Sequence, residues 1–150
     1  MPIYVDHDSA DVWSRQELFK LDNDKRPAYV AGVPPDYFSD TGQLWGNPVY
    51  RWEILKNDGY LWWCQRIEHN LKMYDKVRID HFRGFSQYWE VATGEKNAIN
   101  GRWVDGPGDE LFKALFQRFT DLSIIAEDLG IITPDVVELK EKFKRFRHYP

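Results

Sequence analysis

The sequence predicts an α/β fold in which parallel strands are connected by helices. Along the 150 residues, apolar and amphipathic segments follow the order strand, loop, helix, strand, loop, helix, strand, helix. Strands that alternate with helices are typical of βαβ units, because parallel neighbours need a crossover connection. A chain of this length is expected to form about one domain. The sequence contains no evident internal repeat.

The first two predicted elements are a short strand and a long irregular segment. Residues 2–5 (PIYV) are apolar and lead into the polar residues 6–9, which indicates a strand followed by a loop. Residues 25–48 are interrupted by glycine and proline, which excludes a long helix and predicts an irregular excursion. The interrupting residues are Gly32, Pro34, Pro35, Gly42, Gly46 and Pro48. Because long loops inside compact domains are usually functional, we expect this segment to contribute to a site.

The middle of the chain is expected to form a helix, a strand and a second loop. Over residues 60–74 apolar side chains recur every three or four positions, which predicts an amphipathic helix. They are Tyr60, Trp63, Ile67, Leu71 and Tyr74. Residues 77–82 alternate as in a buried strand, with Asp80 toward its carboxyl end. Around residues 95–108 the pattern gives way to a polar loop that contains glycine.

The C-terminal part is expected to form a helix, a strand and a last helix. One helix face is marked by Leu111, Leu115, Phe119 and Leu122. Residues 123–126 (SIIA) are typical of a strand, and Glu127 follows them directly. Thr133 before Pro134 predicts a helix start, with an N-cap hydroxyl and proline at the first helical position. The inward face of this helix would carry Val136, Leu139 and Phe143.

Composition excludes several classes of protein. The net charge of −4 and the pI near 5.6 argue against a general binder of nucleic acid or of anionic membranes. No apolar run approaches the roughly 20 residues of a membrane helix, and the N-terminus lacks a signal-peptide pattern. The lone cysteine, Cys64, fits a small buried hydrophobe better than a reactive thiol. Aromatic residues make up 16% of the chain, and they can form a core or stack on sugar rings.

Two carboxylates follow predicted strands at corresponding positions. The carboxyl ends of neighbouring parallel strands open on one face, so Asp80 and Glu127 are expected to lie close together. Two carboxyl groups roughly 5–5.5 Å apart suit retaining glycoside chemistry, with one as nucleophile and the other as acid and then base. Arg78 precedes Asp80 by two residues, so its side chain shares that side of the strand and would favour the ionised form of Asp80.

Other uses of these residues remain open from spacing alone. A carboxylate at a strand end often serves as a cap, a loop acceptor or the ion-pair partner of an adjacent arginine. A metal site is a further alternative, with the candidate ligands Asp6, His7, Asp8, Asp80 and His81. No zinc-protease, paired-cysteine, EF-hand or phosphate-loop spacing supports a metal or a nucleotide.

Four sequence motifs closely resemble the 4-α-glucanotransferases, also called amylomaltases or disproportionating enzymes, of glycoside hydrolase family 77. The motifs are VPPDYFS (33–39), TGQLWGNP (41–48), RIDHFRGF (78–85) and IAEDLG (125–130). They occur in the family's order, and the resemblance covers residues 1–143. It implies part of a (β/α)₈ TIM barrel, about strands 3 to 5, with a loop-rich insertion around residues 25–59.

The resemblance also implies roles for individual residues. Asp80 looks like the nucleophile and Glu127 like the general acid/base. Arg78 and His81 correspond to residues that hold the donor sugar and the nucleophile. The loop beside the acceptor subsites matches Tyr37, Phe38, Gln43 and Trp45. A core position for Tyr37, Phe38 and Trp45 remains the alternative.

The activity implied by the resemblance needs no cofactor. It is retaining transfer of an α-1,4-glucan segment to the 4-hydroxyl of another glucan or of glucose, through a covalent glycosyl-enzyme. The partners would be α-1,4-glucans, with no nucleic acid and no membrane. The alternatives are an α-amylase-type hydrolase and a non-catalytic, truncated glucan-binding remnant. A cytoplasmic location is expected, with a plastid as the alternative.

The chain also departs from the family's pattern. An aspartate that normally precedes the strand at Pro2 is missing, and the third catalytic carboxylate should lie beyond Phe143. Residues 144–150 do not look like the family's continuation. A whole barrel needs about 250 residues, so we expect a fragment. We therefore expect these residues alone to be inactive and poorly folded, because a cut barrel leaves unpaired strand edges.

Overall fold

The computed structural model describes residues 1–127, 132–143 and 147–148, which form two compact units. Unit 1 consists of Met1–Ile3, Leu55–Ser86 and Gly106–Pro150. Unit 2 consists of Tyr4–Ile54 and Gln87–Asp105. Among the described residues, no helix is both long enough and apolar enough to cross a bilayer.

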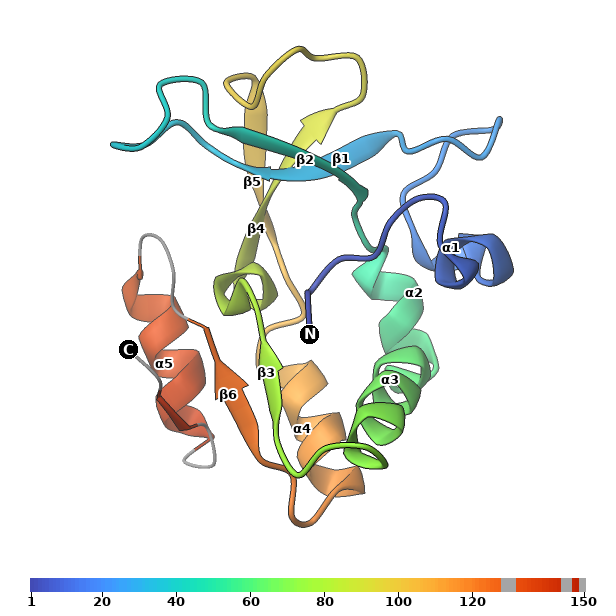
Figure 1. Cartoon of the computed structure of the whole chain (residues 1–150), viewed down its shortest axis with the longest axis vertical. Helices are drawn as coiled ribbons and strands as arrows, with labels where there is room; N and C mark the ends of the chain where they lie inside the picture. The colour runs from blue at the N-terminus through green and yellow to red at the C-terminus, as the bar shows by residue number, and fades with distance from the viewer. Residues whose placement is uncertain (128–131, 144–146, 149–150) are drawn as a thin grey trace. The chain divides into compact units, whose positions relative to one another are not determined.

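Unit 2 is built on a four-stranded antiparallel sheet with the order β2-β1-β4-β5 (Figure 1). Its strands are β1 (Tyr29–Val33), β2 (Gln43–Pro48), β4 (Gln87–Ala92) and β5 (Gly101–Asp105). Before the sheet lie the helix α1 (Ala10–Ser14) and the 3₁₀ turn η1 (Gln16–Leu18). The helix α2 (Trp52–Asn57) begins in unit 2 and ends in unit 1. Buried rings of Phe19 and Tyr50, 5.2 Å apart, contribute to the core of this unit.

The prediction of an irregular segment over residues 25–48 is wrong, because β1 and β2 lie within it. The glycines that suggested a loop instead shape a hairpin. Gly32 sits beside a register irregularity between β1 and β2, and a Cβ there would lie 2.3 Å from the Gln43 carbonyl oxygen. Gly42 has a φ of +68°, where glycine is favoured. The expected loop around residues 95–108 likewise contains β5. Glycine in a strand can therefore mark a bulge or a close backbone approach.

A buried ion cluster crosses the sheet of unit 2. The Glu90 carboxylate on β4 is fully buried and accepts hydrogen bonds from Lys20 Nζ at 2.6 Å and from Arg102 Nε at 2.9 Å. Lys20 also donates to the Tyr88 hydroxyl at 2.9 Å. The Arg102 guanidinium lies 4.9 Å from the centre of the Tyr29 ring. Together these contacts join three of the four strands to the segment after η1.

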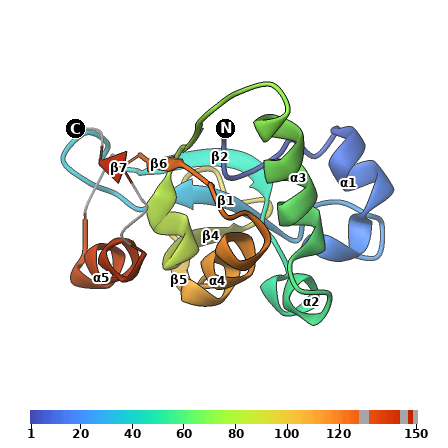
Figure 2. The same cartoon turned by 90° about the horizontal axis from the view of Figure 1, so that it is seen from below.

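Unit 1 contains a three-stranded parallel sheet with the order β3-β6-β7. Its strands are β3 (Val77–Ile79), β6 (Ile124–Ala126) and β7 (Arg147–His148). The helices are α3 (Leu61–Leu71), α4 (Asp109–Arg118) and α5 (Pro134–Lys142), and the 3₁₀ turn η2 (Phe82–Phe85) follows β3. Figure 2 shows α4 and α5 on the same side of the strands. This arrangement confirms the α/β class and the parallel pairing of β3 with β6.

An aromatic cluster forms the core of unit 1. The Phe85 ring meets the rings of Trp63, Phe82 and Phe112 at centroid distances of 5.3, 5.7 and 5.2 Å. All four side chains are buried, and they come from α3, η2 and α4. Edge-to-face pairs of this kind add to the burial energy of the rings. The cluster therefore packs η2 against α3 and α4, shortly after β3 ends.

Several predicted elements are shorter than expected. Residues 2–5 make no strand; Pro2 forms only an isolated parallel bridge to Asp80. The strand predicted over residues 77–82 ends at Ile79, because His81 adopts a left-handed backbone conformation. The helix predicted over residues 60–74 spans 61–71. The last helix begins at Pro134 as predicted, although the Thr133 side chain makes no capping hydrogen bond.

Replacing Glu90 by glutamine should destabilise the full-length protein by about 3 kcal/mol, because two cations would lose their buried counter-charge. The measurement is urea unfolding followed by tryptophan fluorescence. The matched control is Glu95→Gln, which changes an exposed carboxylate of the same unit and should alter stability by less than about 0.5 kcal/mol. Equal midpoints for both variants would contradict a structural role for the ion cluster.

Candidate active site

The pairing of β3 with β6 brings the two predicted carboxylates together. Ile79 is paired with Ala126 in parallel register, so Asp80 and Glu127 occupy the next position on each chain. The main chain continues this pairing, because Glu127 N donates to the Ile79 carbonyl at 3.0 Å. Phe82 N in turn donates to the Glu127 carbonyl at 3.3 Å. Since neighbouring strands lie about 4.8 Å apart, Asp80 and Glu127 are neighbouring residues at the carboxyl ends of the two strands.

Asp80 forms an ion pair with Arg78, which was predicted to lie on the same side of the strand. Arg78 Nε donates to Asp80 Oδ1 at 2.7 Å. The Asp80 side chain is 32% exposed and the Arg78 side chain 59%, so the pair is accessible from solvent. The Met1 amino group lies 3.6 Å from Asp80 Oδ2. An accessible carboxylate beside a fixed cation is suited to act as a nucleophile.

Glu127 is oriented by the backbone of His81, which sequence reasoning missed. The His81 N–H donates to Glu127 Oε2 at 3.1 Å. His81 has φ 57° and ψ 48°, a left-handed conformation that is uncommon for residues other than glycine. This conformation ends β3 and turns the amide of His81 toward the neighbouring strand. Histidine is among the residues enriched in this conformation, but the enrichment is too small to predict the turn from the sequence.

The His81 imidazole is neutral at pH 7. Burial and, to a smaller extent, the nearby Arg83 guanidinium together lower the pKa of His81 from 6.5 to about 4. A neutral imidazole has one donor and one acceptor nitrogen, so it can bind a hydroxyl group in either direction. His81 can therefore contribute two kinds of hydrogen bond beside the carboxylates without adding charge.

The turn η2 and the residues beside it make close packing contacts and hydrogen bonds with three other segments. Gly84 packs so closely that a Cβ there would lie 2.9 Å from Ile3 Cδ1 and 3.1 Å from His81 Cδ2. Gly106 N donates to the Ser86 carbonyl at 2.7 Å. The Ser86 hydroxyl donates to Asp135 at the start of α5, and this hydrogen bond lowers the pKa of Asp135. The backbone that orients Glu127 is thus braced by three segments of unit 1.

The other four predicted site residues lie in unit 2. Tyr37 and Phe38 are fully exposed in the loop between β1 and β2, so the alternative of a core position for them is wrong. The Asp36 carboxylate shapes this loop by accepting the N–H groups of Phe38 and Ser39 at 2.9 and 3.0 Å.

On β2, the exposed Gln43 accepts a hydrogen bond from Trp45 Nε1 at 3.0 Å. The Trp45 ring is 37% exposed and lies 6.3 Å from the Tyr4 ring. Trp45 is therefore also outside the core. Its ring and the Gln43 amide form one polar and aromatic surface on this strand.

The metal and thiol alternatives gain no support in the described part of the chain. No group of three histidine, cysteine or acidic side chains gathers there in a way that would hold a metal ion. Cys64 is buried, and burial raises the pKa of its thiol, so the less reactive protonated form prevails. Asp80 does form an ion pair with Arg78, which was the simplest structural alternative to a catalytic role. Such an ion pair is also compatible with catalysis.

Comparison with known proteins identifies related enzymes along almost the whole chain. The family described as 4-alpha-glucanotransferase matches residues 1–148. A 4-alpha-glucanotransferase of Aquifex aeolicus is 58% identical over 144 residues, which cover 96% of this chain and 30% of that protein. One from Thermus thermophilus is 52% identical over 95% of this chain and 29% of that protein. The chain thus spans about 30% of the length of these curated relatives.

Solved structures agree with this comparison. The amylomaltase from Streptococcus agalactiae, solved in complex with acarbose, superposes with a TM-score of 0.92 at 51% identity. The match covers 95% of this chain and 29% of that one. Amylomaltase from Corynebacterium glutamicum has a TM-score of 0.83 at 21% identity, with coverage of 97% and 20%. The second likeness supports the fold alone.

The buried, neutral state of His81 predicts a pH dependence of stability. Below pH 6.5 the unfolded chain binds a proton that the folded protein takes up only near pH 4. The free energy of unfolding should therefore fall as the pH falls from 6.5 to 4. His81→Gln should flatten this part of the profile, measured by urea unfolding at each pH. His69→Gln, which changes an exposed imidazole, should keep the wild-type slope; an unchanged slope in His81→Gln would contradict the assignment.

Proposed function

Because the chain belongs to the 4-alpha-glucanotransferase family, we propose that the full-length protein transfers α-1,4-glucan segments with retention of configuration. The acceptor is the 4-hydroxyl of another glucan or of glucose. The proposal concerns the full-length protein, since this chain spans about 30% of the length of its relatives. The observation that carries it is the pair of carboxylates, Asp80 and Glu127, that follow two hydrogen-bonded parallel strands.

In the first step Asp80 attacks the anomeric carbon of the donor glucan. A bond forms between the carboxylate oxygen and that carbon, while the bond to the glycosidic oxygen breaks. Glu127 gives its proton to the departing 4-oxygen, so the leaving chain departs as a neutral alcohol. The Arg78 guanidinium supports this role of Asp80, because it donates a hydrogen bond to one carboxylate oxygen and so fixes the position of the side chain.

In the second step Glu127 acts as a base. It removes the proton from the 4-hydroxyl of the acceptor, whose oxygen attacks the anomeric carbon and releases Asp80. Two inversions at the same carbon give net retention. The hydrogen bond from the His81 N–H fixes the position of the Glu127 carboxyl group in both steps.

We assign substrate binding to two groups of residues. Arg78 and the neutral imidazole of His81 hold the donor sugar beside the nucleophile. Tyr37, Phe38, Gln43 and Trp45 form an acceptor-binding surface of unit 2, where exposed rings stack on sugar faces.

We further propose a place for the chain in the larger protein. The parallel strands of unit 1 would form part of a (β/α)₈ barrel, about strands 3 to 5, and residues 25–59 would belong to an insertion in it. The third catalytic carboxylate would come from outside this chain. No cofactor takes part in the proposed steps, and the protein would act in the cytoplasm or in a plastid.

Replacing Asp80 by asparagine should abolish transfer by the full-length protein, by at least about 10⁴-fold in kcat, because an amide of the same shape cannot attack the anomeric carbon. The assay follows the ladder of longer and shorter glucans that wild-type protein makes from maltotriose. Asp75→Asn, which changes an exposed carboxylate just before β3, should keep wild-type activity. Wild-type turnover in Asp80→Asn would remove Asp80 from its role. Release of glucose without longer products would instead indicate a hydrolase.

Replacing Glu127 by glutamine should separate the two kinds of substrate. Transfer from maltotriose should fall by about 10²- to 10⁴-fold, because its leaving group needs a proton. Formation of the glycosyl-enzyme from α-maltotriosyl fluoride should fall far less, since fluoride leaves unprotonated; it is measured as the burst of fluoride release. The control is Glu138→Gln on the exposed face of α5. Equal losses on both substrates would argue against the acid/base role.

A further inference from the structure

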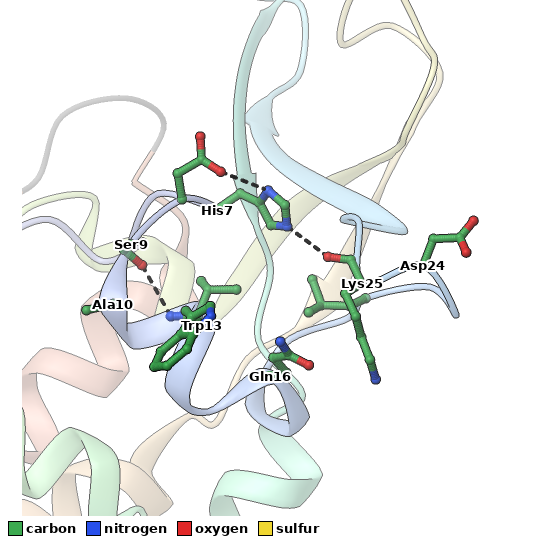
Figure 3. Close-up of a pocket in the computed structure, with 10 residues that line it drawn as sticks. His7, Ser9, Ala10, Trp13, Gln16, Asp24 and Lys25 are labelled. Carbon is green, nitrogen blue, oxygen red and sulfur yellow. Dashed lines mark hydrogen bonds and ion pairs between the residues drawn. The ribbon is translucent and has the colours of Figure 1, made fainter.

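Unit 2 contains a cavity of about 590 Å³ that none of the proposed active-site residues lines. Its walls come from α1, η1 and the segments on either side, and they include His7, Val12, Trp13, Gln16, Asp24 and Lys25 (Figure 3). This volume lies within the range of pockets that bind small molecules.

The rim of the cavity is ordered by short-range and long-range contacts. The His7 ring nitrogen Nε2 bonds to the Lys25 carbonyl at 2.8 Å, joining segments 18 residues apart (Figure 3). The Ser9 hydroxyl accepts the Val12 N–H at 3.2 Å and so caps the start of α1. The hydrogen bond between His7 and Lys25 therefore joins the segment before α1 to the segment after η1.

An exposed indole forms part of this wall. Trp13 is 80% exposed, whereas its neighbour Val12 is buried and anchors α1 to the unit. Among the described residues, the Trp13 side chain has no ring partner and no hydrogen bond. The side chains of Gln16 and Asp24 likewise make no hydrogen bond or ion pair with the described residues. The cavity therefore presents the aromatic plane of Trp13 and the amide of Gln16 to a ligand, whereas the Asp24 carboxylate points away from Trp13 (Figure 3).

This combination of groups fits a neutral sugar. The apolar C–H face of a pyranose stacks on an indole ring, as on other aromatic side chains. Its hydroxyls can exchange hydrogen bonds with the Gln16 amide. The charges of Asp8 and Asp24 outnumber that of Lys25, which disfavours phosphate and other anions.

We propose that this cavity is a second glucan-binding site, which holds one or two glucose units of an α-1,4-glucan on Trp13. The inference rests on the proposed function, because it takes the substrate of that reaction as the ligand. A chain long enough to occupy this site and the active site is held twice, so its effective concentration at the active site rises. Short substrates gain nothing from the second contact. The site therefore sets a preference for long glucans.

The test compares substrates of two lengths in the full-length protein. Trp13→Ala should raise KM for amylose by about five- to tenfold, as expected for the loss of one stacking contact. Its kcat, and both constants for maltotriose, should stay at wild-type values. Trp13→Phe should restore most of the affinity for amylose. The matched control is Tyr74→Ala, which removes an exposed aromatic ring of unit 1 and should leave KM for amylose unchanged.

A second variant and a binding measurement guard against a purely structural effect. Gln16→Ala should raise KM for amylose in the same way. In an Asp80→Asn background, calorimetry with maltoheptaose should show a weak second site that Trp13→Ala removes; cellohexaose should not bind there. An unchanged KM for amylose in Trp13→Ala would overturn the proposal. So would a parallel loss of maltotriose activity or of thermal stability, which would show that another part of the protein covers Trp13. Absence of disproportionation by the wild-type protein would instead refute the proposed function.

Discussion

The parallel register of β3 and β6 is the constraint on which the candidate active site depends. Ile79 pairs with Ala126, and this single match decides that Asp80 and Glu127 emerge at the same level. A slip by one residue would turn one carboxylate to the opposite face of the sheet. The register is supported from both sides, by buried Val77 and Ile79 on β3 and by buried Ile124 on β6. Apolar packing thus determines where the charged groups meet.

The main-chain geometry at His81 then determines how the Glu127 side chain is oriented. The left-handed turn at His81 takes the chain out of β3 and directs one amide N–H to the Glu127 carboxylate. An unusual backbone conformation persists only where its surroundings hold it, and here the aromatic cluster and the Ser86–Asp135 contact do so. The two carboxylates consequently have different environments. Asp80 faces a guanidinium, whereas Glu127 faces a peptide group.

The sequence predicted those helices and strands that are marked by local patterns of apolar residues. Periodicity predicted α3, α4 and the two central strands, and the alternation of elements predicted their parallel pairing. It failed over residues 25–48, because Gly32 and Gly42 read as breakers although they accommodate close contacts of a hairpin. The position of Arg78 beside Asp80 followed from strand geometry. The turn at His81 did not, since it depends on tertiary packing, in which Gly84 leaves room beside the His81 ring.

The main-chain bonds around Glu127 have a consequence for protein chemistry. Its own amide is bonded to Ile79 and its carbonyl to Phe82, so the backbone is secured independently of the side chain. A residue with such an anchor tolerates exchange of its functional group without loss of position. Position 127 is therefore a suitable point for installing a non-natural acid by semisynthesis. A series of side chains with graded acidity at that place would report how the rate depends on proton donation, while the scaffold remained constant.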